Sequence, residues 1–120
     1  MDSNYICDVL LNGRVVFSIK GVTGMTREEI LDKAKEIVTH DRNKQYGEPE
    51  RNFKVIADFW TIYTGVAIDE VDVACMMILF KMGRNGTGKH KSDNYIDICG
   101  YAACGGEIAT RWEELEQKNG

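Results

Sequence analysis

Apolar and polar positions follow two different periods along the chain. In the first 24 residues, two apolar runs rich in β-branched residues flank Asn12-Gly13, a dipeptide that tolerates positive φ, so a β-hairpin is predicted there. From residue 25 onward the apolar positions recur at helical spacing. The sequence therefore predicts one mainly α globular domain, with an N-terminal β-hairpin at 1–24 and a four-helix bundle at 25–120.

Start and stop signals set the bounds of the first two helices. Thr26 and Glu29 have capping-box spacing and precede an apolar stripe that includes Leu31. Residues 40–49 form a polar loop. Pro49 suits the first turn of a second helix, and Gly65 its end. The second stripe consists of Phe53, Ile56, Ala57, Trp60 and Tyr63.

The third and fourth helices are more apolar. Asp69 is a plausible N-cap of the third, which we expect to end near Met82, before a loop over residues 83–91. Ser92 is expected to cap a last helix to about Gln117, with internal glycines that permit close packing or a break: Gly100, Gly105 and Gly106. The third helix is apolar all round, so it lies at the centre of the monomer or in a subunit interface. We expect a homodimer or a dimer of dimers, which would also cover the free edge of the hairpin.

Composition excludes several classes of protein. A net charge of −4 and a pI of about 5.2 argue against general nucleic-acid binding. The sequence has neither a signal peptide nor an apolar run long enough to span a membrane, so a cytoplasmic location is expected. The cysteines lack C-x-x-C spacing, and Cys75, Cys99 and Cys104 fit a helical core as reduced thiols.

Acidic residues at the ends of apolar helices are the first candidate site. Asp72 opens the third helix, while Asp93 and Asp97 lie one turn apart at the start of the fourth. Carboxylates grouped in this way favour Mg²⁺ or Mn²⁺. In a bundle of alternating helices Asp72 would lie at the opposite end from Asp97, and Glu50 would lie at the same end. The alternative is that these acids only stabilise helix N-termini.

Cations in two loops are the second candidate site, for the phosphates of a nucleotide. In the loop before the second helix, Arg42 and Lys44 could hold phosphates and Tyr46 could stack on a base. Four further cations lie in or just before the 83–91 loop: Lys81, Arg84, Lys89 and Lys91. Asn94 is a candidate for binding a base or sugar. The alternative is that both segments are solvated loops. Residues 83–90 nearly match a P-loop, but His90 replaces the hydroxyl residue and a helix precedes the segment, so we reject that interpretation.

Three segments resemble a known family. The runs DRNKQYGEPERNF, DVACMMILFK and KSDNYIDICGYAA, within residues 26–116, are similar to a phage and prophage MazG-like family of unassigned function. More distantly, Asp69-x-x-Asp72 and Asn94-x-x-Asp97 resemble the acidic helix pairs of the all-α nucleoside triphosphate pyrophosphatases. That resemblance implies Mg²⁺-dependent hydrolysis of a nucleoside triphosphate to the monophosphate and pyrophosphate.

This chain departs from the enzyme pattern. Shorter aspartates stand at 69 and 72, and the neutral Asn94 replaces an acid, which makes a weaker cation site. Three functions therefore stay open: a nucleoside triphosphate pyrophosphohydrolase, a non-catalytic phage protein that sequesters a signalling nucleotide of host defence, or a structural and interaction protein.

Overall fold

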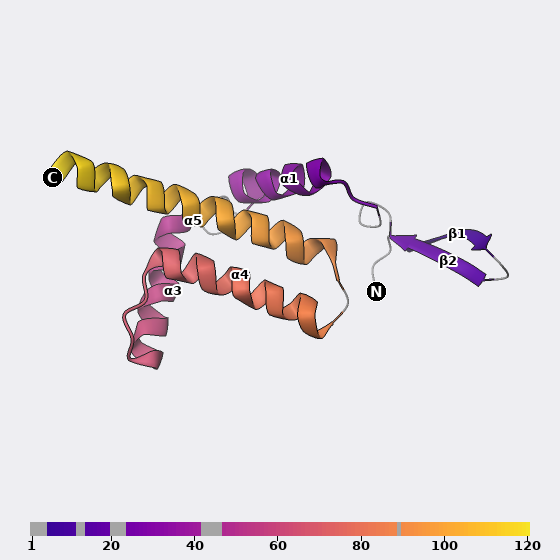
Figure 1. Cartoon of the computed structure of the whole chain (residues 1–120), viewed down its shortest axis with the longest axis horizontal. Helices are drawn as coiled ribbons and strands as arrows, with labels where there is room; N and C mark the ends of the chain where they lie inside the picture. Colours follow the sequence, from indigo (N-terminus) through magenta and orange to yellow (C-terminus); the bar gives the residue numbers. More distant parts are fainter. Residues whose placement is uncertain (1–4, 12–13, 20–23, 42–46, 89) are drawn as a thin grey trace.

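The chain is mainly helical (Figure 1). The computed structural model describes residues 24–41, 47–88 and 90–120, and the backbone of residues 5–11 and 14–19. Strand β1 (Tyr5–Leu11) pairs antiparallel with β2 (Arg14–Ile19). Asn12-Gly13, on which the hairpin prediction depends, lies outside the described residues. The helices are α1 (Arg27–Glu36), continued by a π-helical turn η1 (Ile37–Asp41), then α3 (Pro49–Thr64), α4 (Glu70–Thr87) and α5 (Ser92–Asn119).

The capping signals in the sequence are confirmed at three helix ends. The Thr26 hydroxyl accepts from the Glu29 backbone N–H, and the Glu29 carboxylate accepts from the Thr26 N–H. Asp69 and Asp72 form the same reciprocal pair at the start of α4. Gly65 ends α3 at a φ of 73°, a left-handed conformation that favours glycine.

Two other predicted boundaries are wrong. Helix α4 does not end near Met82 but continues to Thr87, because Asn85 is buried against α5 and Thr87 donates to the Gly83 carbonyl. These interactions offset the low helix propensity of the glycines in this segment. The N-cap of α5 is Lys91, not Ser92, which is the first helical residue.

The helices do not alternate in direction as a simple bundle would. Helix α4 is antiparallel to α5, since Asn85 meets Asn94 and Ala74 meets Gly105. Helix α1 is parallel to α5: Ala34 lies near Ile96 and Asp97, whereas Thr39 lies farther along, near Ala103 and Glu107. Helix α3 runs across the other helices (Figure 1). The alternating arrangement expected from the sequence is therefore wrong.

The core lies where α3 crosses α4 and α5. Its buried members come from these three helices: Phe53, Ala57, Val73, Ala74, Cys104 and Ile108. A Cβ on Gly105 would lie 2.8 Å from the Ala74 Cβ, so glycine is what allows α4 and α5 to approach here. A Cβ on Gly100 would lie 3.1 Å from Val38. The expected close packing is thus found at two of the three glycines, and α5 runs through all three without a break.

Several residues predicted to be buried lie on the surface instead. Leu31, Tyr63 and Cys75 are exposed, while Cys99 is half-buried and Cys104 is in the core. The three cysteines named here are free thiols. Within the described part of the chain, every helix is too short or too polar to cross a lipid bilayer.

Candidate functional site

The clearest concentration of predicted ligand-binding residues is a pocket between the end of α4 and the start of α5. It is lined by Arg84, Thr87, Gly88, Lys91 and Asn94 and has a volume of about 240 Å³. Three of these residues, Arg84, Lys91 and Asn94, were predicted from the sequence to bind a nucleotide. We call this the cationic pocket.

The local fold explains why these side chains meet. The antiparallel α4 and α5 are joined by a short connection, so the last turn of one helix adjoins the first turn of the other. Arg84 and Thr87 come from the last turns of α4, while Lys91 and Asn94 come from the start of α5. The first N–H groups of a helix and its dipole favour an anion at this position. Two cations therefore face a helix N-terminus that reinforces their attraction for negative charge.

A buried pair of amides forms the floor beneath this pocket. Asn94 Nδ2 donates to Asn85 Oδ1 at 2.7 Å, and each residue is only 7% exposed. The hydrogen bond joins α4 to α5 and fixes the orientation of Asn94. The remaining amide hydrogens of Asn85 and Oδ1 of Asn94 have no protein partner among the described residues. A buried amide with such capacity is suited to bind a polar ligand.

An aromatic pair lies next in sequence to two residues of the pocket. His90 Nδ1 and the Tyr95 hydroxyl are 2.8 Å apart, and the two rings are stacked with an interplanar angle of 9°. These residues neighbour Lys91 and Asn94 in the chain, and the Tyr95 residue is 40% exposed. The partly exposed Tyr95 ring is therefore close in sequence to the pocket, although neither ring lines it.

Lys81, another predicted phosphate ligand, has a different partner. Its Nζ lies 2.8 Å from Oδ2 of Asp97, and its side chain is only 15% exposed. The ion pair joins α4 to α5 one turn below Arg84. Lys81 and Asp97 therefore neutralise each other, and neither lines the cationic pocket.

The predicted acidic metal site does not form within one chain. Asp72 lies nine residues before Lys81, the partner of Asp97, which corresponds to about 13 Å along α4. This is too far for Asp72 and Asp97 to bind one ion directly. Asp93 is exposed in the first turn of α5. Among the described residues, no three His, Cys, Asp or Glu side chains come together as metal ligands would. The four predicted acids therefore do not come together as one Mg²⁺ or Mn²⁺ site within the described part of the chain.

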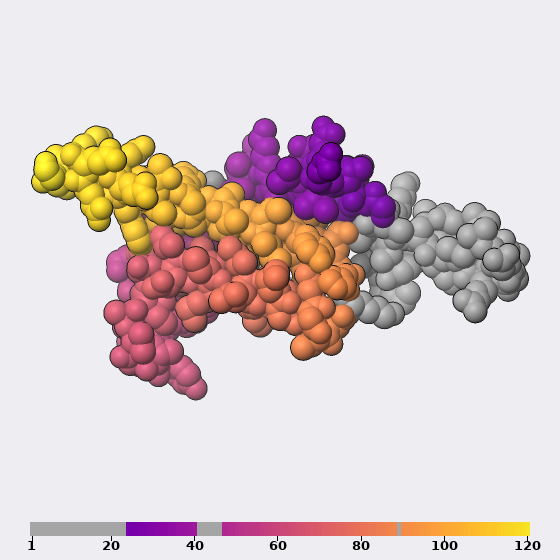
Figure 2. Space-filling view, in the orientation of Figure 1, coloured from indigo at the N-terminus to yellow at the C-terminus, as the bar shows by residue number. Residues whose placement is uncertain are grey.

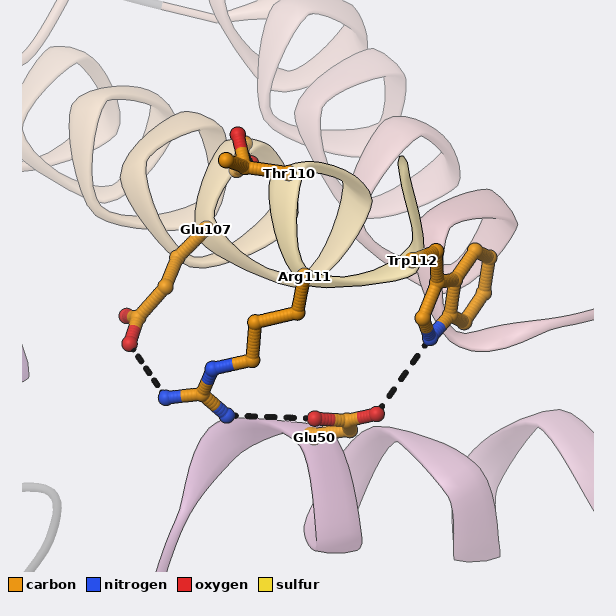
Figure 3. Close-up of polar contacts among 6 residues, drawn as sticks. Glu50, Glu107, Thr110, Arg111 and Trp112 are labelled. Atoms are coloured by element: carbon orange, nitrogen blue, oxygen red, sulfur yellow. Dashed lines mark hydrogen bonds and ion pairs between the residues drawn. The ribbon is translucent and has the colours of Figure 1, made fainter. Parts of the chain in front are cut away.

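Glu50 was expected near Asp97, and this prediction is wrong. Its carboxylate accepts from Arg111 at 3.1 Å and from the Trp112 indole N–H at 3.3 Å, as Figure 3 shows. Arg111 lies 14 residues after Asp97, about 21 Å along α5. The parallel course of α1 and α5 explains the error, because it brings the start of α3 to the far part of α5.

The Glu50–Arg111 cluster joins α3 to α5. Arg111 also pairs with Glu107 one turn earlier (Figure 3). The hydrogen bond to Glu50 and the charge of Glu107 raise the pKa of Arg111, which stays protonated. A depression larger than the cationic pocket, with Thr39 and Glu48 among its lining residues, lies beside this cluster. Since its carboxylates are paired with Arg111, the cluster serves to hold the two helices together.

Four predicted ligands cannot be placed in either region. Arg42, Lys44, Tyr46 and Lys89 lie outside the described residues. The residues that flank 42–46 lie near Glu107 and Arg111, at a distance from the cationic pocket. The sequence-based expectation that the 40–47 loop shares an end of the molecule with Asp97 depended on alternating helices, which the fold does not have.

Sequence reasoning missed three residues of the pocket region: Asn85, Thr87 and Gly88. All three fall in a segment predicted as a loop. One signal was available, since Asn85 and Asn94 flank the connection symmetrically between two helices of apolar sequence. A polar residue in such a position is expected to find a partner.

Comparison with known proteins places the chain in a family. The family described as Domain of unknown function (DUF6378) matches residues 29–109, about two thirds of the chain. The chain belongs to this family. The matched region runs from α1 into α5, so it includes the cationic pocket and the Lys81–Asp97 ion pair.

Two relatives come from bacteriophages. The chain is 45% identical over 78 residues to the Gene 55 protein of Mycobacterium phage D29, covering 64% of this chain and 51% of that protein. It is 40% identical over 74 residues to the Gene 55 protein of Mycobacterium phage L5, covering 61% and 47%. The chain thus spans about half the length of these relatives. No solved structure matches it.

Proposed function

We propose that this protein binds the phosphate groups of a nucleotide in the cationic pocket. The observation that carries the proposal is the meeting of Arg84 and Lys91 at the N-terminus of α5. Arginine and lysine are the usual protein ligands of phosphate, and helix N–H groups add further donors. The overall charge of −4 makes this local concentration of cations more specific to a small anion than to a nucleic acid.

The groups beside the cations favour a nucleotide over inorganic phosphate. Tyr95 and His90 offer a ring surface on which a base can stack, and the buried amide of Asn94 can form hydrogen bonds with a base or sugar. Asn94 lines the pocket, and His90 and Tyr95 are next in sequence to its residues Lys91 and Asn94. Phosphate, sugar and base would then each have a partner of suitable chemistry.

We propose binding without hydrolysis. In the all-α pyrophosphatases, which the chain distantly resembles in its acidic helix pairs, acidic helices hold the catalytic metal. Here Asp97 is paired with Lys81 and Asp72 is part of a helix cap within the chain. The phage relatives favour a protein that sequesters a signalling nucleotide of the host's defence, a role that needs affinity rather than turnover.

The test is calorimetric titration with ATP, GTP, their deoxy forms and cyclic nucleotides, alongside a pyrophosphate-release assay with Mg²⁺. Replacing both Arg84 and Lys91 by alanine should weaken binding at least tenfold, about 1.4 kcal/mol, because two charge-assisted contacts are lost. A matched control replaces Lys35 and Lys118, exposed cations elsewhere on the helices, and should bind as the wild type does. Binding should also weaken at high salt.

Three results would contradict the proposal. Failure of the wild type to bind any nucleotide in the panel would remove its basis. Equal loss in the Lys35 and Lys118 control would show that net charge rather than the pocket is responsible. Pyrophosphate release that depends on Mg²⁺ would replace binding with the enzymatic function.

A further inference from the structure

The α3–α4 face is an apolar surface that no described segment of the chain covers. Large hydrophobic side chains are exposed along both helices and, at Val66, just after α3: Val55, Phe59, Ile62, Tyr63, Val66, Met76, Leu79, Phe80 and Met82. Tyr63 is 91% exposed, Ile62 80% and Leu79 69%. The exposed residues of each helix recur at helical spacing, so each helix presents a continuous stripe. Large exposed apolar surfaces on a globular protein usually mark a site of interaction.

Helices α3 and α4, which carry the two stripes, meet at an angle and together form an L. Figure 1 shows α3 crossing the start of α4 and projecting beyond it, away from α5. The space-filling view shows this end of α3 standing out from the body of the molecule (Figure 2). An L-shaped surface can interlock with an identical one after a twofold rotation, because each projecting arm then fills the open corner of the other.

We infer that a second copy of this chain packs on the α3–α4 face, with the two α4 helices antiparallel about a twofold axis. Such an isologous contact uses the same patch on both copies and closes the assembly. The projecting end of α3 from each copy lies across the far end of the partner's α4. The apolar residues that α4 leaves exposed then become buried.

The exposed apolar area of the α3–α4 face is large enough for a dimer interface. Nine large side chains, on average more than half exposed, present roughly 1,000 Å² of apolar surface. One partner in an interface of standard size contributes about 800 Å². A second copy that covers the face would therefore bury enough surface for a stable association at micromolar concentration.

Charge favours a second copy in the antiparallel orientation. Helix α4 begins with Asp69, Glu70 and Asp72 and carries Arg84 in its last turns. Antiparallel packing brings Asp72 of each copy toward Arg84 of the other copy. Parallel packing would instead bring like charges together. The patch is therefore complementary to itself in charge as well as in shape.

The interface would reach the cationic pocket. Arg84 lines the pocket and stacks on Phe80, with its Cζ 5.7 Å from the ring centroid, and Phe80 belongs to the α3–α4 face. The second copy would therefore cover one edge of the pocket and place its Asp72 beside Arg84, so this carboxylate and a bound phosphate would compete for the same cation. The dimer itself does not depend on the proposed nucleotide binding.

The experiment is light scattering coupled to gel filtration at micromolar concentration. The wild type should show twice the 13.6 kDa mass of the chain. Ile62→Glu and Leu79→Glu should each shift it to the monomer, because a charge cannot be buried there unpaired. Leu31→Glu and Leu115→Glu are matched controls, 58% and 55% exposed but outside the face, and should stay dimeric. Far-UV circular dichroism confirms folding, and Ile62 is exposed enough that its substitution spares the monomer.

A charge exchange tests the orientation. Asp72→Lys and Arg84→Glu should each weaken the dimer at least tenfold, and the double variant should recover most of the loss.

A wild-type monomer, whether or not it binds lipid vesicles or another protein, would overturn the inference, as would dissociation by the Leu31 or Leu115 control. A fourfold mass that Leu79→Glu reduces would support the face as one of two interfaces. Nucleotide titration of Leu79→Glu separates the proposals, since the pocket residues are intact in that variant.

Discussion

Lys81 and Asp97 form an ion pair in which Nζ lies 2.8 Å from Oδ2, at a position where the sequence suggested a metal ligand. The ammonium group takes the place that a cation would need next to this carboxylate. It also ties the middle of α4 to the first turns of α5, directly below the cationic pocket. A carboxylate that was expected to bind Mg²⁺ thus stabilises the junction of two helices.

Removing the carboxylate should therefore destabilise the fold. Asp97→Ala leaves the largely buried Lys81 ammonium unpaired and should cost about 1 kcal/mol, a value kept low because Asp97 is 36% exposed to solvent. Lys81→Met in the same background should recover most of the loss, because an apolar side chain of similar length fills the site. Urea denaturation of the wild type, Asp97→Ala, Lys81→Met and the double variant gives the coupling free energy between the two side chains. Additive losses in the double variant would count against the ion pair, and a Mg²⁺-induced rise in Tm that vanishes in Asp97→Ala would restore the metal hypothesis.

The buried amide pair should be more sensitive. Asn94→Ala removes the donor to Asn85 Oδ1 and leaves that acceptor buried without a partner, at a cost of about 1–3 kcal/mol. Asn119→Ala, at the exposed end of α5, is the control and should change the denaturation midpoint little. If Asn94→Ala were as stable as the control, the pair would contribute nothing to the α4–α5 junction.

Two adjacent glycines should respond in opposite directions. Gly105→Ala places a Cβ 2.8 Å from that of Ala74, so α4 and α5 must move apart and stability should fall by about 1–3 kcal/mol. Gly106→Ala meets nothing within 4 Å and should gain up to about 1 kcal/mol from helix propensity. The difference in Tm between the two variants measures the close crossing directly. Equal Tm values would mean that the helices have room to separate.

Local signals in the sequence were sufficient for most helix ends. The capping box at Thr26, the caps at Asp69 and Gly65, and Pro49 at the start of α3 depend on residues within one turn, and all are confirmed. The extension of α4 to Thr87 could not be predicted from local signals. It depends on a contact between Asn85 and Asn94, which local propensity does not report.

The candidate site was predicted only in part, for a topological reason. Arg84, Lys91 and Asn94 are close in sequence, and the fold brings these three predicted residues together in one pocket, while their role in nucleotide binding stays a prediction. A prediction of the acidic site required the directions of all the helices, and no pattern in the sequence indicates that α1 runs parallel to α5. Glu50 was therefore assigned to the wrong end. The exposure of Tyr63 has a similar origin, because a helical stripe does not reveal whether its partner is another helix or another subunit.

The contact of Glu50 with Trp112 offers a spectroscopic test of the α3–α5 junction. Glu50→Ala removes the acceptor for both Arg111 and the indole N–H, so we expect a loss of about 0.5–2 kcal/mol and a red shift of tryptophan emission as Trp112 gains access to water. Glu50→Gln keeps an acceptor for the indole, so its emission should stay near that of the wild type although the ion pair with Arg111 is lost. Glu113→Ala, beside Trp112 on the exposed side of α5, is the control for a general effect of charge. Identical emission from the alanine and glutamine variants would show that Glu50 does not hold the indole, and that Trp112 is kept in place by packing against the core alone.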